Sequence, residues 1–183
     1  PDFMRKKITV VGAGNVGAPL AVHLADAGHQ VTLAGDPASS DSIASALARS
    51  SRLVAAPVPE AVAGAEVVFL CTPYRANAEI LPRLADALVG KILVDSTNPV
   101  GPGLTHGLKS ERSGSAAVQA LAPDARVVKA FSIYGFENFE DPAYPGYGVR
   151  PAMLFCGDDA SAKAAVAGLI DAVGFEPVDV GGL

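Results

Sequence analysis

The stretch KITVVGAGNVG, residues 7–17, decides the fold of this chain. Its first five residues form a short β-branched run, which predicts a buried parallel strand over Lys7–Val11. Glycines follow directly in the spacing Gly-X-Gly-X-X-Gly. An amphipathic helix is expected over Asn15–Ala27, and Gly28 would end it in the left-handed conformation. This order of strand, glycine loop and helix is typical of a phosphate-binding turn.

Each glycine of the loop has a separate physical role in such a turn. Gly12 permits the tight turn, Gly14 lets the backbone approach a pyrophosphate, and Gly17 lets the helix pack close to the strand. The N–H groups at the start of the helix and the helix dipole stabilise negative charge. We therefore expect a dinucleotide along the whole loop, which consists of Gly12, Ala13, Gly14, Asn15, Val16 and Gly17. The alternative is a glycine turn that binds no ligand.

An acidic residue, Asp36, follows the second predicted strand, Gln30–Ala34. Its carboxylate could accept hydrogen bonds from both hydroxyls of an adenosine ribose, which favours NAD over NADP. A 2′-phosphate would meet this negative charge, and residues 30–47 contain no Lys or Arg to neutralise it. Nearby serines could still bond such a phosphate, and Asp36 could instead be only a turn residue before Pro37.

The rest of the chain alternates strands with helices. This predicts a Rossmann-type, doubly wound α/β fold, with a mostly parallel sheet and helices on both faces. Further strands are expected over Leu53–Ala55, Glu66–Cys71, Lys91–Asp95, Arg126–Ala130, Ala152–Cys156 and Phe175–Val180. Further helices are expected over Asp41–Ser50 with Asp41 as its cap, Pro59–Ala63, Asn77–Val89, Ser113–Leu121 and Ala160–Val173. The 183 residues suit one dinucleotide-binding domain over 1–183, with irregular segments at Asn98–Gly107 and Phe131–Arg150.

Ligands of an open parallel sheet lie beyond the carboxyl ends of its strands. Thr72, Pro73 and Tyr74 follow the fourth predicted strand, so we expect them to touch the nicotinamide half of the dinucleotide. Asn98 and Pro99 follow the fifth strand, where Asn98 could bond a ribose or the carboxamide. Each of these residues could instead serve only to cap or turn the chain.

The three histidines are the first candidates for a catalytic proton donor. His23 on the first helix and His29 in the turn after it are expected to pack or to face solvent. His106 lies in the glycine-rich loop and is the one candidate general acid. The sequence indicates no nucleophile dyad and no lysine in a catalytic setting. Direct hydride transfer between two bound cofactors depends on positioning more than on acid–base groups, so this pattern fits such chemistry.

Composition argues against several classes of protein. A net charge of −5 disfavours binding to nucleic acids or anionic membranes. No stretch reaches the roughly 18 apolar residues that span a bilayer, and no metal-ligand cluster is visible. Cys71 and Cys156 lie in apolar runs that predict buried strand ends, which fits a reducing compartment. We expect a cytoplasmic protein whose partners are small molecules.

Several motifs beyond the glycine loop resemble one family, the NADP oxidoreductases dependent on coenzyme F420, a deazaflavin. The resemblance covers nearly the whole chain, and the oxidoreductase domain of the STEAP metalloreductases is similar too. The motifs are ITVVGAGNVG at 8–17, AGH at 27–29, VVKAF at 127–131, CGDD at 156–159 and GFEPVDVG at 174–181.

The resemblance implies hydride transfer between NADPH and a deazaflavin whose ring stacks on the nicotinamide. It places F420 or a flavin, as a second cofactor or substrate, against Val100, Phe131, Ser132, Ile133 and Tyr134. The family's NADP-binding members carry a Thr within the glycine loop and a Ser-Arg pair after the second strand. This chain has Ala13, Gly35 and Asp36 at these positions. Because the residues that bind the 2′-phosphate in the family are absent, the first cofactor can be NAD or NADP. Relatives continue into C-terminal helices that help form a homodimer, and we expect these helices to be absent here.

Three functions stay open. The first is an oxidoreductase that passes hydride between a nicotinamide dinucleotide and a deazaflavin or flavin-like acceptor. The second is an NAD(P)-dependent dehydrogenase of a small carbonyl or imine, with His106 or a solvent proton as the acid. The third is a dinucleotide-binding module with little catalysis, which the lack of a firm catalytic residue favours.

Overall fold

The strands form one eight-stranded sheet in a computed structural model that describes residues 4–144 and 146–183. Their order is β3-β2-β1-β4-β5-β6-β7-β8, and its first six positions have the order of a dinucleotide-binding fold. The strands are β1 (Lys7–Val11), β2 (Gln30–Ala34), β3 (Leu53–Ala56), β4 (Val67–Leu70), β5 (Ile92–Asp95), β6 (Arg126–Lys129), β7 (Ala152–Gly157) and β8 (Glu176–Asp179). The predicted Rossmann-type α/β fold is confirmed.

Strands β1 to β6 pair in parallel, and the direction of the strands reverses only after β6. In β1, Ile8 is in register with Val31 of β2 and with Val67 of β4. β7 runs antiparallel to β6, and β8 lies parallel to β7. All four residues of β4 are buried, because helices cover both faces of the sheet.

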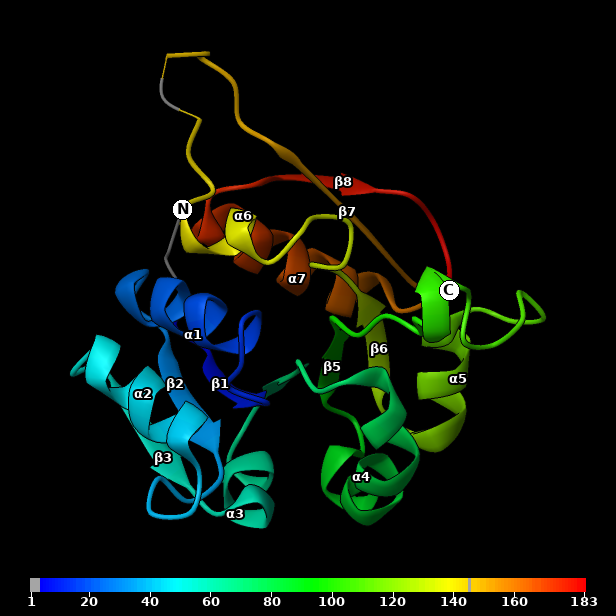
Figure 1. Cartoon of the computed structure of the whole chain (residues 1–183), viewed down its shortest axis with the longest axis horizontal. Helices are drawn as coiled ribbons and strands as arrows, with labels where there is room; N and C mark the ends of the chain where they lie inside the picture. The colour runs from blue at the N-terminus through cyan, green and yellow to red at the C-terminus, as the bar shows by residue number, and fades with distance from the viewer. Residues whose placement is uncertain (1–3, 145) are drawn as a thin grey trace.

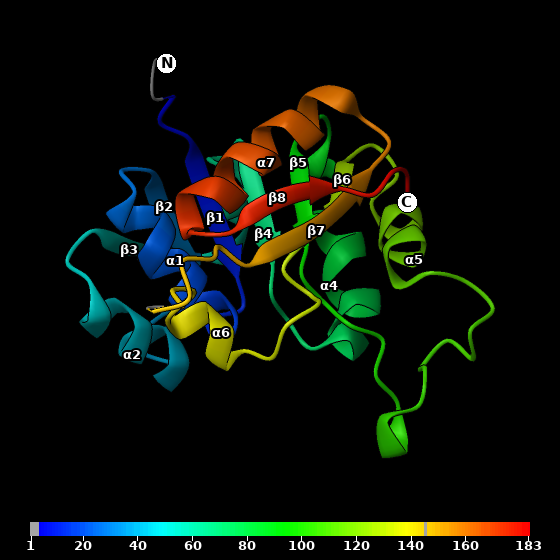
Figure 2. The same ribbon diagram turned by 90° about the horizontal axis from the view of Figure 1, so that it is seen from above.

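Helices enclose the sheet in two layers (Figure 1, Figure 2). One core layer packs α1, α2, α6 and α7 against the sheet, and the other packs α3, α4 and α5. Successive strand residues supply opposite layers, as Phe69 and Leu70 of β4 do. The helices are α1 (Gly17–Asp26), α2 (Asp41–Arg49), α3 (Val58–Ala63), α4 (Asn77–Leu84), α5 (Gly114–Leu121), α6 (Glu137–Glu140) and α7 (Ala160–Val173).

Three local predictions are wrong. The cap of α2 is Ser40, whose hydroxyl accepts the N–H of Ile43 at 3.4 Å, and Asp41 is the first helical residue. The segment after β6 contains α6, a helix of one turn that we expected to be irregular. Cys71 and Cys156 lie at strand ends as expected, but both are half-buried free thiols rather than buried ones.

Two histidines hold α1 in place. His23 donates from Nε2 to the carbonyl of Phe139 at 2.8 Å and so ties α1 to α6. His29 is buried, and its Nδ1 accepts the backbone N–H of Lys6 at 3.1 Å. Burial lowers the pKa of His29, and the charge of Lys6 adds to this effect. Both histidines therefore have structural roles, as predicted.

Candidate dinucleotide-binding site

The glycine loop joins β1 to α1, and contacts within the chain account for two of its three glycines. Gly12 has a positive φ of 95°, and a Cβ there would lie 2.7 Å from the carbonyl oxygen of Cys71. A Cβ on Gly17 would lie 1.8 Å from the carbonyl oxygen of Gly12. No side chain fits at either position, because the loop packs against β4 and α1 packs against the loop.

Gly14 is different. It is exposed, and no heavy atom of the described residues lies within 4 Å of the position where its Cβ would be. Its φ is not in the left-handed region either. The fold of the chain therefore does not require a glycine here. A ligand that approaches the backbone closely would require one, and a pyrophosphate fits this space.

The start of α1 suits an anion as well. Within the described part of the chain, no side chain caps this end of α1, and its first turn has no acidic residue. Side chains of Ser40, Ser113 and Asp159 cap α2, α5 and α7, whereas α3, α4 and α6 resemble α1 in having no side-chain cap among the described residues. Backbone N–H groups at an uncapped helix start can bind phosphate oxygens. Asn15 and Gly14 are the exposed residues of the loop, whereas Ala13 packs into the core.

Asp36 lies just beyond β2 and is exposed. Its Oδ1 accepts the backbone N–H of Ala38 at 2.9 Å. Asp36 therefore forms a turn, which was the alternative to its role as a ribose ligand. A Cβ on the preceding Gly35 would lie 2.3 Å from Cδ1 of Ile43. A side chain at position 35 would require the Ile43 side chain to turn away, and the φ of 144° at Gly35 also disfavours one.

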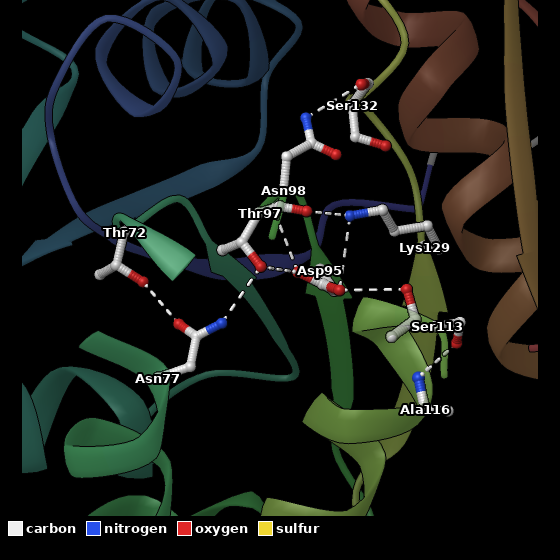
Figure 3. A network of polar contacts seen from close by, with 10 residues as sticks. Thr72, Asn77, Asp95, Thr97, Asn98, Ser113, Ala116, Lys129 and Ser132 are labelled. Carbon is white, nitrogen blue, oxygen red and sulfur yellow. Dashed lines mark hydrogen bonds and ion pairs between the residues drawn. The ribbon is translucent and has the colours of Figure 1, made fainter. Parts of the chain in front are cut away.

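A buried ion pair lies at the carboxyl ends of β5 and β6 (Figure 3). The Asp95 side chain is 0% exposed and that of Lys129 is 19% exposed, and Lys129 Nζ lies 3.5 Å from Asp95 Oδ2. Lys129 also donates to the carbonyl of Thr97. Burial lowers the pKa of Lys129, and the Asp95 carboxylate partly opposes this shift. Ser115 adds a hydrogen bond to Asp95 Oδ2 at 3.1 Å.

Lys129 was not among the site residues predicted from the sequence. It belongs to the VVKAF motif, which indicates only the family resemblance. A signal did exist: Asp95 and Lys129 have opposite charges, and each lies at or next to the end of a predicted strand. The two strands turn out to be neighbours, with Asp95 and Lys129 in register.

The residues expected near the nicotinamide come together at the carboxyl ends of β4, β5 and β6. Thr72 Oγ1 donates to Oδ1 of Asn77 at 3.0 Å, and Asn77 Nδ2 donates to Thr97 Oγ1 at 3.1 Å. Asn98 Nδ2 donates to the carbonyl of Ser132 at 3.1 Å and links the ends of β5 and β6. Burial raises the pKa of Tyr74, and the charge of Asp95 adds to this shift.

The residues that the family resemblance placed on the second-cofactor side divide into two groups. Val100 and Ile133 are exposed, and Val100 also lines a neighbouring cavity. Phe131 is 1% exposed and its ring centroid lies 5.8 Å from that of Phe69, so its side chain is part of the core and not of the cleft. Its backbone has a positive φ of 59°. Tyr134 is half-buried and stacks on Phe175.

A cavity of about 520 Å³ lies next to this edge, between the 98–106 segment, the start of α5 and the end of β6. Asn98, Pro99, Val100, His106 and Lys129 are among its lining residues. His106 is exposed, and its Nδ1 accepts the backbone N–H groups of Leu108 at 3.1 Å and Ser110 at 3.3 Å. In the neutral ring the proton is therefore on Nε2, where it can be donated.

Residues 4–144 and 146–183 include no group of three His, Cys, Asp or Glu side chains that could hold a metal ion. They also include no helix with the length and apolar character needed to cross a membrane.

Comparisons with known proteins identify the family. The model of the family "NADP oxidoreductase coenzyme F420-dependent" matches residues 7–99. Metalloreductase STEAP3 of Rattus norvegicus is 33% identical over 97% of this chain, and the chain spans only 34% of that relative. The structure of a candidate F420-dependent NADP-reductase from Arthrobacter sp. FB24 is 32% identical, with a TM-score of 0.85 over 97% of this chain and 85% of that one.

A hypothetical protein of Sinorhizobium meliloti has a similar structure. It is 30% identical, and the match has a TM-score of 0.86 over 98% of this chain and 86% of that one. The family model covers half of the chain, and the two solved structures extend the likeness to nearly all of it. The chain belongs to the family of NADP oxidoreductases dependent on coenzyme F420.

Proposed function

We propose that this domain binds a nicotinamide dinucleotide along the loop from Gly12 to Gly17 and transfers hydride between it and a deazaflavin or flavin-like acceptor. The open space beside Gly14 carries this proposal. Contacts within the chain account for Gly12 and Gly17 but not for Gly14, and a ligand close to the backbone would account for it. Family membership supports the hydride chemistry and the type of acceptor.

The positions of the site residues suggest how the dinucleotide lies. Its pyrophosphate binds at the uncapped start of α1, and its adenosine ribose lies beside Asp36 at the end of β2. The nicotinamide extends toward Thr72 and Asn98, beyond β4 and β5. The acceptor then occupies the neighbouring cavity, whose lining includes His106 and Lys129.

The bound dinucleotide supplies the hydride, and the residues of the chain supply positioning. The Asp95–Lys129 pair and the bond from Asn98 to Ser132 hold the ends of β5 and β6 in one arrangement. His106 and Lys129 both present N–H groups at the cavity, so either can donate the proton that accompanies hydride in reduction of the acceptor. These two donors also favour a second candidate function, the reduction of a small carbonyl or imine.

A transfer assay tests the proposal. The purified protein is mixed with NADH or NADPH and with oxidised F420, FMN or a small carbonyl, and absorbance follows each reactant. We expect one of the nucleotides to reduce F420 or the flavin. Reduction of the carbonyl alone would favour the second candidate. Tight nucleotide binding without any reduction would mean a binding module and would contradict both.

Replacing Asp36 with arginine is expected to reverse the nucleotide preference. The native carboxylate accepts hydrogen bonds from a ribose and repels a 2′-phosphate, so NADH should bind about tenfold more tightly than NADPH. The guanidinium of Asp36→Arg would pair with the 2′-phosphate and favour NADPH by a similar factor. Dissociation constants from fluorescence titration measure both ratios.

The control for this variant is Asp86→Arg. It makes the same charge change on an exposed residue after α4, at the opposite end of the strands, and should leave the ratio as it is in the native protein. An unchanged ratio in Asp36→Arg itself would show that Asp36 serves only the turn with Ala38.

A further inference from the structure

A line of side-chain hydrogen bonds runs from the cleft at Thr72 to the buried carboxylate of Asp95 (Figure 3). Its steps are Thr72 to Asn77 at 3.0 Å, Asn77 to Thr97 at 3.1 Å, and Thr97 Oγ1 to Asp95 Oδ1 at 2.6 Å. Asn77, Thr97 and Asp95 are 2%, 3% and 0% exposed. Buried polar groups of this kind keep the partners that the fold gives them.

The direction of each bond follows from the Asp95 end. Asp95 Oδ1 accepts the backbone N–H of Thr97 at 2.9 Å, and Oδ2 faces the ammonium of Lys129. Both partners can only donate, so the carboxylate only accepts. The hydroxyl of Thr97 must then donate its one proton to Asp95. Thr97 Oγ1 in turn accepts from the amide nitrogen of Asn77, which directs the amide oxygen toward Thr72.

These bond directions also fix the orientation of the Thr72 hydroxyl in the cleft. The amide oxygen of Asn77 can only accept, so the hydroxyl of Thr72 donates its proton to Asn77. Thr72 Oγ1 then has only lone pairs for a ligand. Thr72 is half-buried and follows β4, where the proposed function places the nicotinamide. A hydroxyl that rotated freely could instead act toward a ligand as either donor or acceptor.

We propose that the relay formed by Asp95, Thr97 and Asn77 keeps Thr72 a hydrogen-bond acceptor, and that Thr72 thereby selects the amide N–H of the nicotinamide carboxamide. The inference rests on the proposed function, because it needs a dinucleotide in the cleft. It makes Thr72 a specificity-determining residue and Thr97 a positioning residue. Ring substituents that offer an acceptor but no N–H meet lone pairs at Thr72 and bind less well.

The test compares an oxidised dinucleotide with its 3-acetylpyridine analogue, in which a methyl group replaces the amide nitrogen. The native protein should bind the amide about tenfold more tightly, the factor expected for one hydrogen bond. Thr97→Val removes the relay hydroxyl and nearly keeps the shape of the side chain. The Asn77 amide can then turn over, Thr72 can donate to the acetyl group, and the ratio should fall toward one.

Three further variants separate the relay from general damage to the site. Thr97→Ser keeps the hydroxyl and should restore the native ratio. Ser115→Ala removes another hydrogen bond to Asp95, but one on Oδ2 and outside the path to Thr72, so it should not change the ratio. Thr72→Val removes the acceptor itself and should abolish the preference even if Thr97→Val does not fold.

Binding of ADP-ribose separates failure of the relay from failure of the proposed function. ADP-ribose lacks the nicotinamide, so every folded variant should bind it as the native protein does. If the native protein bound neither ADP-ribose nor a dinucleotide, the proposed function would be wrong. If it bound them but showed no preference for the amide, or if Thr97→Val and Thr72→Val kept the native preference, the relay proposal would be overturned.

Discussion

Gly14→Val is expected to abolish dinucleotide binding and to leave the fold intact. The new side chain would occupy a space that is open in the folded chain, so it should meet no neighbour and cost little stability. A bound pyrophosphate would occupy that same space, and we expect affinity to fall by at least about a hundredfold. Calorimetric titration with NADH and NADPH, together with thermal unfolding, measures the two effects separately.

Two other glycines serve as controls. Gly168 in α7 is also exposed with open space at its Cβ position, so Gly168→Val makes the same substitution away from the cleft and should bind dinucleotide as the native protein does. Gly17→Val should instead prevent folding, because its Cβ would lie 1.8 Å from a backbone oxygen. Retained affinity in Gly14→Val would refute the pyrophosphate assignment.

Local patterns predicted the elements whose determinants are local. β1 and β2 have the predicted bounds because each is a short β-branched run between clear boundary signals. α7 also has its predicted bounds. The Asp159 side chain caps its start by accepting the N–H of Ala162 at 2.7 Å, and Gly174 ends it with a φ of 114°.

Elements that depend on distant contacts could not be predicted in this way. α6 has four residues, too few to be stable alone, and it forms because Phe139 enters the core and His23 bonds its backbone. The reversed direction of β7 also depends on more than its local sequence. The sequence pattern of β7 indicates a strand, but its antiparallel pairing with β6 depends on the path of the chain between them.

The residues of the candidate site also differ in whether their roles depend on local sequence or on distant contacts. The tight turn at Gly12, with its φ of 95°, and the close contact of Gly17 with the carbonyl oxygen of Gly12 were predictable because both lie within a loop of six residues. The Asp95–Lys129 pair was not, because 34 residues separate its members in the sequence and only the register of β5 and β6 joins them. Phe131 matched the family motif, yet its side chain lies in the core. A sequence motif does not show where a side chain points, nor that the backbone at Phe131 has a φ of 59°.

Lys129→Met should cost the protein a large part of its stability. Asp95 is fully buried, and its carboxylate would lose its one cationic partner among the described residues. Hydrogen bonds from Thr97 and Ser115 would remain, but they leave a net negative charge inside the protein. Removal of one partner of a buried ion pair costs roughly 3–5 kcal/mol, and we expect a loss of about 3 kcal/mol here. Urea denaturation gives the free energy of unfolding.

Lys163→Met is the matched control for this experiment. Its side chain is 16% exposed, close to the value for Lys129, but its partner Asp179 is 50% exposed and lies 2.7 Å away. Water can solvate Asp179 after the change, so this substitution should cost less than about 1 kcal/mol. Replacing Asp95 with asparagine in the Lys129→Met background removes the stranded charge and should recover part of the loss. Equal losses in Lys129→Met and Lys163→Met would mean that Lys129 stabilises the protein by packing alone, and that the buried charge of Asp95 is compensated by its hydrogen bonds.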